Sequence, residues 1–360
     1  MKILFQNRFD CYLTPGGDTT QMLKTKEHLE KLGVIVDISL NPNVDLSNYD
    51  LVHIFNIMRP FETYLFIKNA LSQNTKILMS SIYWDFDEFN KIGRESISLS
   101  FLYQNFDEFF VEKLKYLFKR HNIIKGFEKK FIYFFLEDYK KILEKVDLFL
   151  PNSKIEGEII QRRISKNIKY GVVSNAVDSK LFSLTAPVKR DRQFLTIARI
   201  DPRKNILNLI RAFENLNYKL DIYGNNSPLH NSYLIKANDL LTKNTKINNY
   251  VQHHDLLNLY NKHEIHILPS WLETPGLVQL EAAACGCNII STIKGSAYEY
   301  FGEFATYCEP GSSLKIAEAI HKAKGNMLDP KNMSEFILDN YTWQKTAEQT
   351  NSFYESVLNE

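Results

Sequence analysis

The sequence predicts an α/β protein of two domains, each built on a parallel sheet. Short β-type apolar runs alternate with helical patterns along the chain, and this alternation occurs in two separate series. The 360 residues, 44% of them hydrophobic, also suffice for two domains of about 100–200 residues each. We expect ligands to bind at the carboxyl ends of the strands, as they do in open parallel sheets.

The first series begins with a strand at residues 2–6 and a loop that holds Gly16, Gly17 and Asp18. A helical stretch follows from Thr19 to Leu32 and stops at Gly33. Each later run of apolar residues is flanked by polar or turn residues, so each is a strand candidate. These candidates are residues 34–38, 51–55, 76–80 and 148–150.

The second series has strand candidates at residues 194–198, 219–223, 265–268 and 288–291. Between the series, the stretch to Arg192 contains Pro187 and few apolar residues, which is typical of an interdomain connection. The predicted domains are 1–175, with a helical insertion at about 91–145, and 176–340, followed by a terminal segment at 341–360.

Charge and hydropathy narrow the functional classes. The formal net charge is +2 on 44 basic and 42 acidic residues, so no global field argues for a nucleic-acid partner. The first seven residues become polar too soon for a signal peptide. No apolar run approaches the roughly 18 residues that a membrane span needs. We therefore expect a cytoplasmic protein.

Residues 269–281 form a strand, loop and helix unit. Thr274, Pro275 and Gly276 can place free backbone N–H groups at the helix N-terminus, where an anionic group such as a diphosphate is favoured. Glu273 and Glu281 are eight positions apart and can point into one crevice, one toward a sugar and one toward a ribose. In the alternative, Glu273 complements the helix dipole and Glu281 is solvated. The spacing alone leaves both interpretations open.

Residues 198–205 directly follow the first strand of the second series. Arg199 and Lys204 are five positions apart across a proline turn and could hold two phosphates of a donor. Fixed cations of this kind stabilise the negative charge that develops on a leaving diphosphate. The alternative is a solvated basic loop.

The order of these elements resembles the family 4 retaining glycosyltransferases of the GT-B superfamily, glycosyl transferases group 1. That family carries a strand followed by an arginine and a lysine five apart, then a strand ending in glycine, then Pro-Ser and two glutamates separated by seven residues. The matching segments here are 198–205, 220–224 and 269–281. The likeness runs from about residue 170 to the C-terminus. It implies two Rossmann-like domains that face each other across a cleft, with a C-terminal helix crossing back to the first domain.

The resemblance also implies site roles. Arg199 and Lys204 would bind the donor diphosphate, Glu281 the ribose and Glu273 the transferred sugar, so that Glu273, Arg199 and Lys204 are the expected catalytic residues. The full expected donor set is Gly16, Gly17, Arg199, Lys204, Gly224, Glu273, Gly276, Leu277, Val278 and Glu281. No cofactor and no metal are expected, because the sequence lacks a paired-aspartate motif and the basic clamp does the work of a divalent cation.

Candidates for acceptor or sugar contacts lie in the first half of the chain. Many family members place a histidine after a later strand, whereas residues 79–85 here offer Tyr83, Trp84 and Asp85 instead. Tyr83 and Trp84 could equally be packed aromatics. His53 ends a strand candidate and is either a pocket residue or a core histidine.

The insertion interleaves lysines with phenylalanines, a composition that suits contact with an anionic membrane surface. Its acidic residues dilute the charge, and its aromatics could instead pack on the sheet, so both interpretations stay open.

The function expected from the resemblance is retaining transfer of a hexose-type sugar from a UDP-sugar, or a GDP-sugar, to a glycan or lipid-linked acceptor in surface polysaccharide or glycolipid biosynthesis. A nucleotide-sugar epimerase of similar build and a noncatalytic nucleotide-sugar-binding protein are the alternatives.

Overall fold

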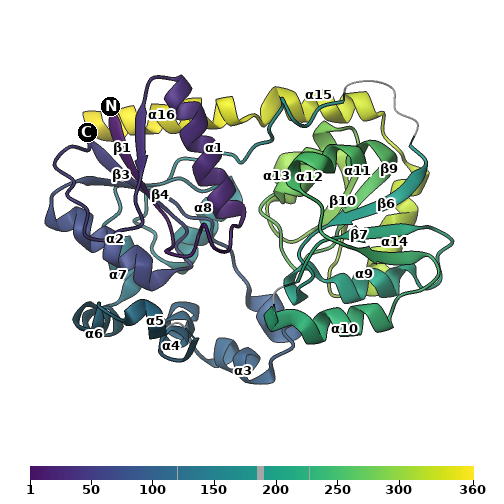
Figure 1. Ribbon diagram of the computed structural model, residues 1–360, viewed down its shortest axis with the longest axis horizontal. Coiled ribbons are helices and arrows are strands. Elements are labelled where there is room, and N and C mark those ends of the chain that lie inside the picture. The colour runs from purple at the N-terminus through teal and green to yellow at the C-terminus, as the bar shows by residue number, and fades with distance from the viewer. Residues whose placement is uncertain (120, 185–189, 227) are drawn as a thin grey trace. The chain divides into compact units, whose positions relative to one another are not determined.

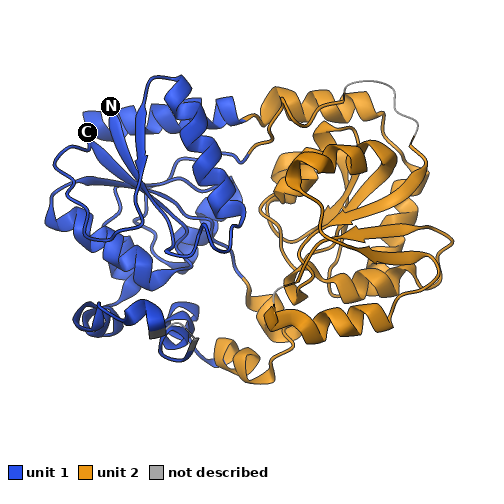
Figure 2. Cartoon of the chain, in the orientation of Figure 1, with its two compact units in different colours: residues 1–85, 105–175, 343–360 blue, residues 86–104, 176–342 orange. Residues whose placement is uncertain are grey.

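The computed structural model describes residues 1–119, 121–184, 190–226 and 228–360. Arg120 of the insertion and Pro187 of the predicted connection therefore lie outside the described residues. The chain forms two compact units (Figure 2). The first contains residues 1–85, 105–175 and 343–360, and the second contains residues 86–104 and 176–342.

The first unit is built on a five-stranded parallel sheet of order β2-β1-β3-β4-β5. Its strands are β1 Lys2–Gln6, β2 Ile35–Ile38, β3 Leu51–Phe55, β4 Lys76–Ser80 and β5 Leu148–Phe149. Helices α1 (Gly17–Lys31) and α16 (Trp343–Asn359) pack on each other and on the sheet face that carries Ile3 and Phe5. Strand β3 is buried along its whole length. This is expected for a parallel sheet, whose inner strands are covered on both faces.

The two units divide the predicted insertion, and its larger part, residues 105–145, lies in the first unit beside α2 (Pro60–Ser72), as Figure 1 shows. Its helices are α4 Glu108–Lys119, α5 His121–Ile124, α6 Glu128–Leu136 and α7 Tyr139–Leu143, and α8 Lys154–Arg163 follows β5. Helices α4, α6 and α7 all contact α2. Among the described helices, none is both long enough and apolar enough to cross a bilayer.

The second unit is built on a six-stranded parallel sheet of order β11-β10-β9-β6-β7-β8. The strands are β6 Arg192–Ile197, β7 Leu220–Tyr223, β8 Thr245–Asn248, β9 His263–Leu268, β10 Asn288–Thr292 and β11 Ala305–Cys308. The helices are α3 Ile97–Asn105, α9 Ile206–Phe213, α10 Asn231–Asp239, α11 Leu256–Lys262, α12 Leu277–Ala284, α13 Ala297–Phe301, α14 Ser313–Gly325 and α15 Pro330–Asn340. One apolar cluster joins the sheet to α9, α10 and α14, and another joins it to α11, α12, α13 and α15.

The predicted fold class, α/β with two parallel-sheet Rossmann-like domains, is confirmed. The units do not follow continuous ranges of the chain, however. Residues 86–104 lie in the first half of the sequence but pack with the second unit, and residues 343–360 at the C-terminus pack with the first. The strands β8 and β11 were not among the predicted ones.

Candidate active site

The loop after β6 is held by its own side chains. The Asp201 carboxylate accepts the backbone N–H groups of Arg203 and Lys204 at 3.0 and 3.2 Å, which caps a single turn of 3-10 helix. Asn205 then adopts the left-handed conformation with φ 59°. Its side-chain amide donates to the carbonyl oxygens of Pro269 and Pro310 at 3.0 and 2.7 Å. These bonds fix the loop after β6 against the loop after β9.

Lys204 and Glu273 form an ion pair at the carboxyl edge of this sheet. Lys204 Nζ lies 2.5 Å from Glu273 Oε1, and the Glu273 side chain is almost fully buried. The backbone of Glu273 is fixed as well, because its N–H donates to the Lys294 carbonyl and its carbonyl accepts from the Ser296 N–H. Two residues that are 69 positions apart in the sequence thus meet in a rigid setting.

Gly276 carries the chain from Glu273 into α12. Its φ is +84°, and a Cβ at this position would lie 3.0 Å from Glu273 Oε2, so a side chain would be strained and would crowd the carboxylate. Leu277 and Val278 form the first turn of α12, where helix geometry leaves backbone N–H groups without partners inside the helix. Binding of a phosphate or sugar by these donors stays a prediction.

Glu281 is the fifth residue of α12, about one turn into the helix, and its side chain is buried. Its carboxylate oxygens bond His253 Nε2 at 2.7 Å and the Tyr260 hydroxyl at 2.9 Å. The alternative of a solvated Glu281 is therefore wrong. Tyr260 is itself fully buried, and burial together with the Glu281 charge raises its pKa well above the usual value. Tyr260 stays a neutral donor that orients Glu281.

Gly224 marks the close approach of the β7 end to the β6 end. A Cβ at Gly224 would lie 1.8 Å from the carbonyl oxygen of Ala198, so only glycine fits here. Arg199 is largely exposed, and its Nε lies 3.6 Å from the Asp201 carboxylate. The structure therefore places Arg199 and Lys204 on one loop that Asp201 organises, and it pairs Lys204 with Glu273.

Phe89 and Gly93 of the segment 86–104 pack against Trp271, which lies two positions before Glu273. The Phe89 ring lies 6.4 Å from the Trp271 ring, and a Cβ on Gly93 would lie only 2.7 Å from it. The backbone N–H of Trp271 donates to the Arg203 carbonyl at 2.9 Å. Trp271 thus contacts both site loops, a role that the sequence reasoning missed because nothing local shows where residues 86–104 pack.

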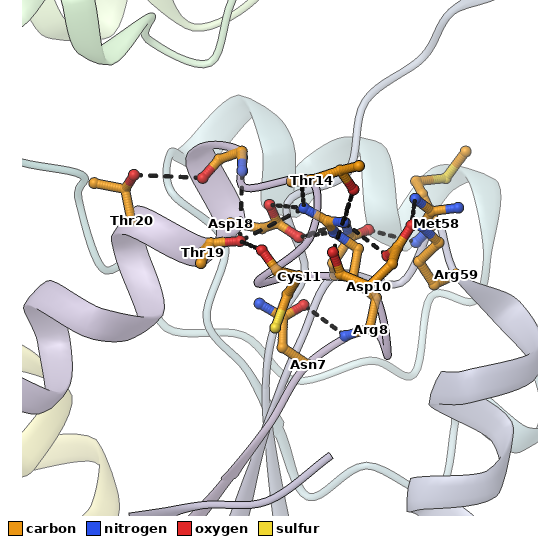
Figure 3. Close-up of polar contacts among 12 residues, drawn as sticks. Asn7, Arg8, Asp10, Cys11, Thr14, Asp18, Thr19, Thr20, Met58 and Arg59 are labelled. Atoms are coloured by element: carbon orange, nitrogen blue, oxygen red, sulfur yellow. Dashed lines mark hydrogen bonds and ion pairs between the residues drawn. The ribbon is translucent and has the colours of Figure 1, made fainter. Parts of the chain in front are cut away.

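In the first unit, the glycine loop has a protein partner, Arg8 (Figure 3). Arg8 Nε lies 2.6 Å from Asp18 Oδ2, and its NH2 group donates to the Thr14 carbonyl at 2.6 Å. A Cβ on Gly16 would lie 2.9 Å from Asp18 Oδ1. The first turn of α1, which contains Gly17, therefore already holds a carboxylate. Phosphate binding by Gly16 and Gly17 stays a prediction.

The Arg8 cluster includes a second ion pair. Arg8 NH1 lies 2.7 Å from Asp10 Oδ1, and Arg59 lies 3.3 Å from Asp10 Oδ2 (Figure 3). Burial alone would lower the pKa of Arg8, but Asp18 and Asp10 outweigh it and raise that pKa. Sequence reasoning missed this cluster, although two charged residues directly after a buried strand were a usable signal.

His53 lies in the core of the first unit. Its ring nitrogens bond the Tyr354 hydroxyl at 2.5 Å and Ser80 Oγ at 2.9 Å, and it stacks on Phe55. Burial lowers its pKa to about 3, so the ring is neutral. This placement matches the core-histidine alternative and not an acceptor contact.

Tyr83 and Asp85 also have polar partners within the first unit. Tyr83 is buried and its hydroxyl donates to the Glu108 carboxyl group, while Asp85 pairs with Arg163. Trp84 is buried as well. For Tyr83 and Trp84 the structure favours packed aromatics, the alternative to a sugar contact.

Comparison with known proteins finds a family match within the second unit. Residues 180–338 match the family described as Glycosyl transferases group 1. The chain is 30% identical over 113 residues to one subunit of the Homo sapiens phosphatidylinositol N-acetylglucosaminyltransferase, covering 30% of this chain and 23% of that protein. It is 23% identical over 243 residues to the Schizosaccharomyces pombe gpi3 subunit of the transferase with the same name, covering 64% and 52%. The chain spans about half or less of the length of these relatives.

Solved structures share the fold along the whole chain. Sucrose-phosphate synthase from Thermosynechococcus elongatus has a TM-score of 0.74 at 17% identity, covering 100% of this chain and 99% of that one. Anabaena Alr3699/HepE in complex with UDP-glucose has a TM-score of 0.71 at 14% identity, covering 99% and 100%. At these identities the likeness establishes the fold alone.

Proposed function

Because residues 180–338 match the family described as Glycosyl transferases group 1, we propose that this chain is a glycosyltransferase. It moves a hexose-type sugar from a nucleoside diphosphate sugar, with UDP favoured and GDP the alternative, to a glycan or lipid-linked acceptor with retention of configuration. The family match supports glycosyl transfer as the reaction class. UDP complexes among proteins of the same fold support the choice of base.

The observation that carries the proposal is the Lys204–Glu273 pair beside α12. An ammonium group has three donors, so Lys204 can keep its bond to Glu273 and still donate to a phosphate oxygen. Glu273 keeps an oxygen for a sugar hydroxyl, and buried Glu281 presents a fixed carboxylate for ribose hydroxyls. Arg199, on the same loop, is the second cation for the diphosphate.

In the proposed step the bond between the sugar and the diphosphate breaks, and the acceptor hydroxyl attacks from the same face. The departing phosphate oxygen helps to take the hydroxyl proton. Lys204 and Arg199 stabilise the growing negative charge on the diphosphate more than they stabilise the bound donor, which lowers the barrier. We assign no covalent nucleophile and no metal to the reaction.

A lipid-linked acceptor is favoured by the relatives, which are named for transfer to phosphatidylinositol. Such an acceptor would place the protein at the cytoplasmic membrane face during turnover. The proposed pathway is then the synthesis of a glycolipid or a surface polysaccharide.

Thermal shift in EDTA tests the donor site. Wild type, Lys204→Ala and the control Lys315→Ala are compared against nucleoside diphosphates and their sugars. Lys315 is an exposed lysine that pairs with Glu318, as Lys204 pairs with Glu273. One diphosphate should raise the Tm of wild type and of the control. Loss of one charge-assisted bond, about 1.5–3 kcal/mol, should weaken binding at least tenfold in Lys204→Ala.

Two results would count against the proposal. If no diphosphate shifts wild type in EDTA but one does with Mg²⁺, the metal-free assignment is wrong. If none shifts it in either buffer, the donor site is wrong. Donor consumption without any acceptor would instead favour an epimerase, and binding without consumption a noncatalytic binding protein.

A further inference from the structure

Helix α6 is apolar on both of its faces. Phe131 and Phe134 are buried on the side that packs toward α2. On the other side Ile132, Tyr133 and Leu136 are exposed by 58%, 63% and 78%. A surface helix of a self-contained domain normally carries polar residues on its outer face. The outer face of α6 therefore has the composition of a second contact surface.

Helix α4 has the same two-faced character. Phe109 and Tyr116 are buried inward, and the Tyr116 hydroxyl donates to the Glu62 carboxyl group on α2. Outward, Phe110, Leu117 and Phe118 recur at helical spacing, and Phe118 is 79% exposed. The apolar outer positions follow one face of the helix, as they do where a helix meets a partner.

The two outer faces adjoin. The Phe110 ring on α4 lies 6.4 Å from the Phe135 ring on α6. Lys113 of α4 also donates to the Glu137 carbonyl, just beyond the end of α6, at 2.6 Å. The outer face of α4 thus meets α6 at Phe110. We call the exposed apolar side chains of the two helices, Phe110, Leu117, Phe118, Ile132, Tyr133 and Leu136, their outer apolar surface.

Positive charge accompanies this surface. Residues 125–136 contain three lysines, Lys125, Lys129 and Lys130, against the single acid Glu128, and all three lysines are exposed. Lys129 precedes Ile132, Tyr133 and Leu136 by three, four and seven positions, so it shares their face of α6. A helix with apolar and aromatic residues beside lysines fits the boundary between acyl chains and anionic headgroups.

We propose that the outer apolar surface of α4 and α6 docks on an anionic bilayer. Phe110, Phe118 and Leu136 enter the acyl boundary, and the lysines at the start of α6 meet lipid phosphates. A protein partner would need an acidic patch opposite these lysines. Anionic headgroups carry the negative charge themselves, so a bilayer needs no such patch. The inference deepens the proposed function, since it brings the chain to a lipid-linked acceptor, but its test needs no catalysis.

Flotation with vesicles of phosphatidylcholine alone, or with 30% phosphatidylglycerol, is the test. Wild type should float with the anionic vesicles and lose most binding in high salt. Leu136→Asp should lower the partition coefficient on the order of tenfold or more. Leu314→Asp is the matched control, because Leu314 is an exposed leucine, 75% accessible, on α14 of the second unit. Lys129→Glu with Lys130→Glu should remove the preference for anionic vesicles.

Several outcomes would overturn the proposal. Wild type could fail to float with either vesicle, or Leu136→Asp could bind as wild type does. If Leu136→Asp instead abolishes a concentration-dependent dimer, the occupant is a second copy of the chain. Circular dichroism and the diphosphate thermal shift, measured on each variant, separate misfolding and failure of the donor site from loss of membrane binding.

Discussion

Glutamine in place of Glu62 and Glu108 removes two titratable groups that hold α4 in the first unit. Glu62 on α2 accepts the Tyr116 hydroxyl of α4, and Glu108 on α4 accepts the Tyr83 hydroxyl from the loop after β4. Burial raises the pKa of Glu62 to about 7, and the bond from Tyr116 offsets only part of that effect. Burial likewise raises the pKa of Glu108 to about 7. Among the described residues, Glu62 Oε1 has no hydrogen-bond partner, which also favours the neutral acid.

The sign of the pH dependence follows from these pKa values. Unfolded glutamate has a pKa of 4.5, so between pH 4.5 and about 7 the folded unit holds more protons than the unfolded chain. Stability is therefore full below pH 4.5 and falls as the pH rises to about 7. The difference between the folded and unfolded pKa corresponds to about 3 kcal/mol for each carboxyl group.

Hydrogen exchange of the α4 amides in the intact chain measures this effect locally. After correction for intrinsic exchange, wild type should lose protection of α4 between pH 5 and pH 7.5, by up to about 3 kcal/mol for each carboxyl that opening exposes. Glu62→Gln and Glu108→Gln should each flatten part of this dependence, because an amide keeps a polar partner for the tyrosine but does not titrate. The reasoning fails if wild type and the double variant show the same pH profile.

Three further substitutions and one control probe the second unit. Gly224→Ala forces a Cβ toward the Ala198 carbonyl and should lower the free energy of unfolding, measured by denaturant titration, by about 1–3 kcal/mol. A free energy of unfolding equal to that of wild type would refute the close approach. Glu281→Gln removes the proposed ribose carboxylate and should weaken diphosphate binding by about tenfold in calorimetry, whereas nucleobase specificity should stay. Gly93→Val displaces the Trp271 ring and should lower kcat/KM for the donor, while Gly325→Ala, where a Cβ meets nothing within 4 Å, should not. Equal activity of these last two variants would exclude a positioning role for residues 86–104.

Apolar runs predicted every strand that has neighbours on both sides, and also β2 and β5, the two edge strands of the first sheet. The edge strands β8 and β11 of the second sheet were missed. Strand β8 contains Thr245, Lys246 and Asn248, which an edge position with one open side tolerates, so no apolar run marks it. Their place depends on neighbouring strands and not on a local pattern.

The candidate site was predictable as a set of residues, but not as a set of contacts. Spacing and resemblance singled out Lys204, Glu273 and Glu281. They did not show that Lys204 pairs with Glu273, or that His253 and Tyr260 hold Glu281, because these pairs are distant in sequence. The sequence shows which residues can take part in the chemistry. It does not show their partners, because these depend on how the loops pack in the folded protein.

The assignment of residues 86–104 to the second unit constrains how the chain folds during synthesis. When these residues leave the ribosome, Trp271 is still 167 positions away, which at usual elongation rates means a wait of roughly 10–30 s. Phe89 stays without its partner ring for that time. The first unit waits longer still, since Tyr354, the hydrogen-bond partner of His53, follows Trp271 by 83 positions. The first half of the chain therefore cannot complete either of its sets of contacts until the segments that contain Trp271 and Tyr354 have been made.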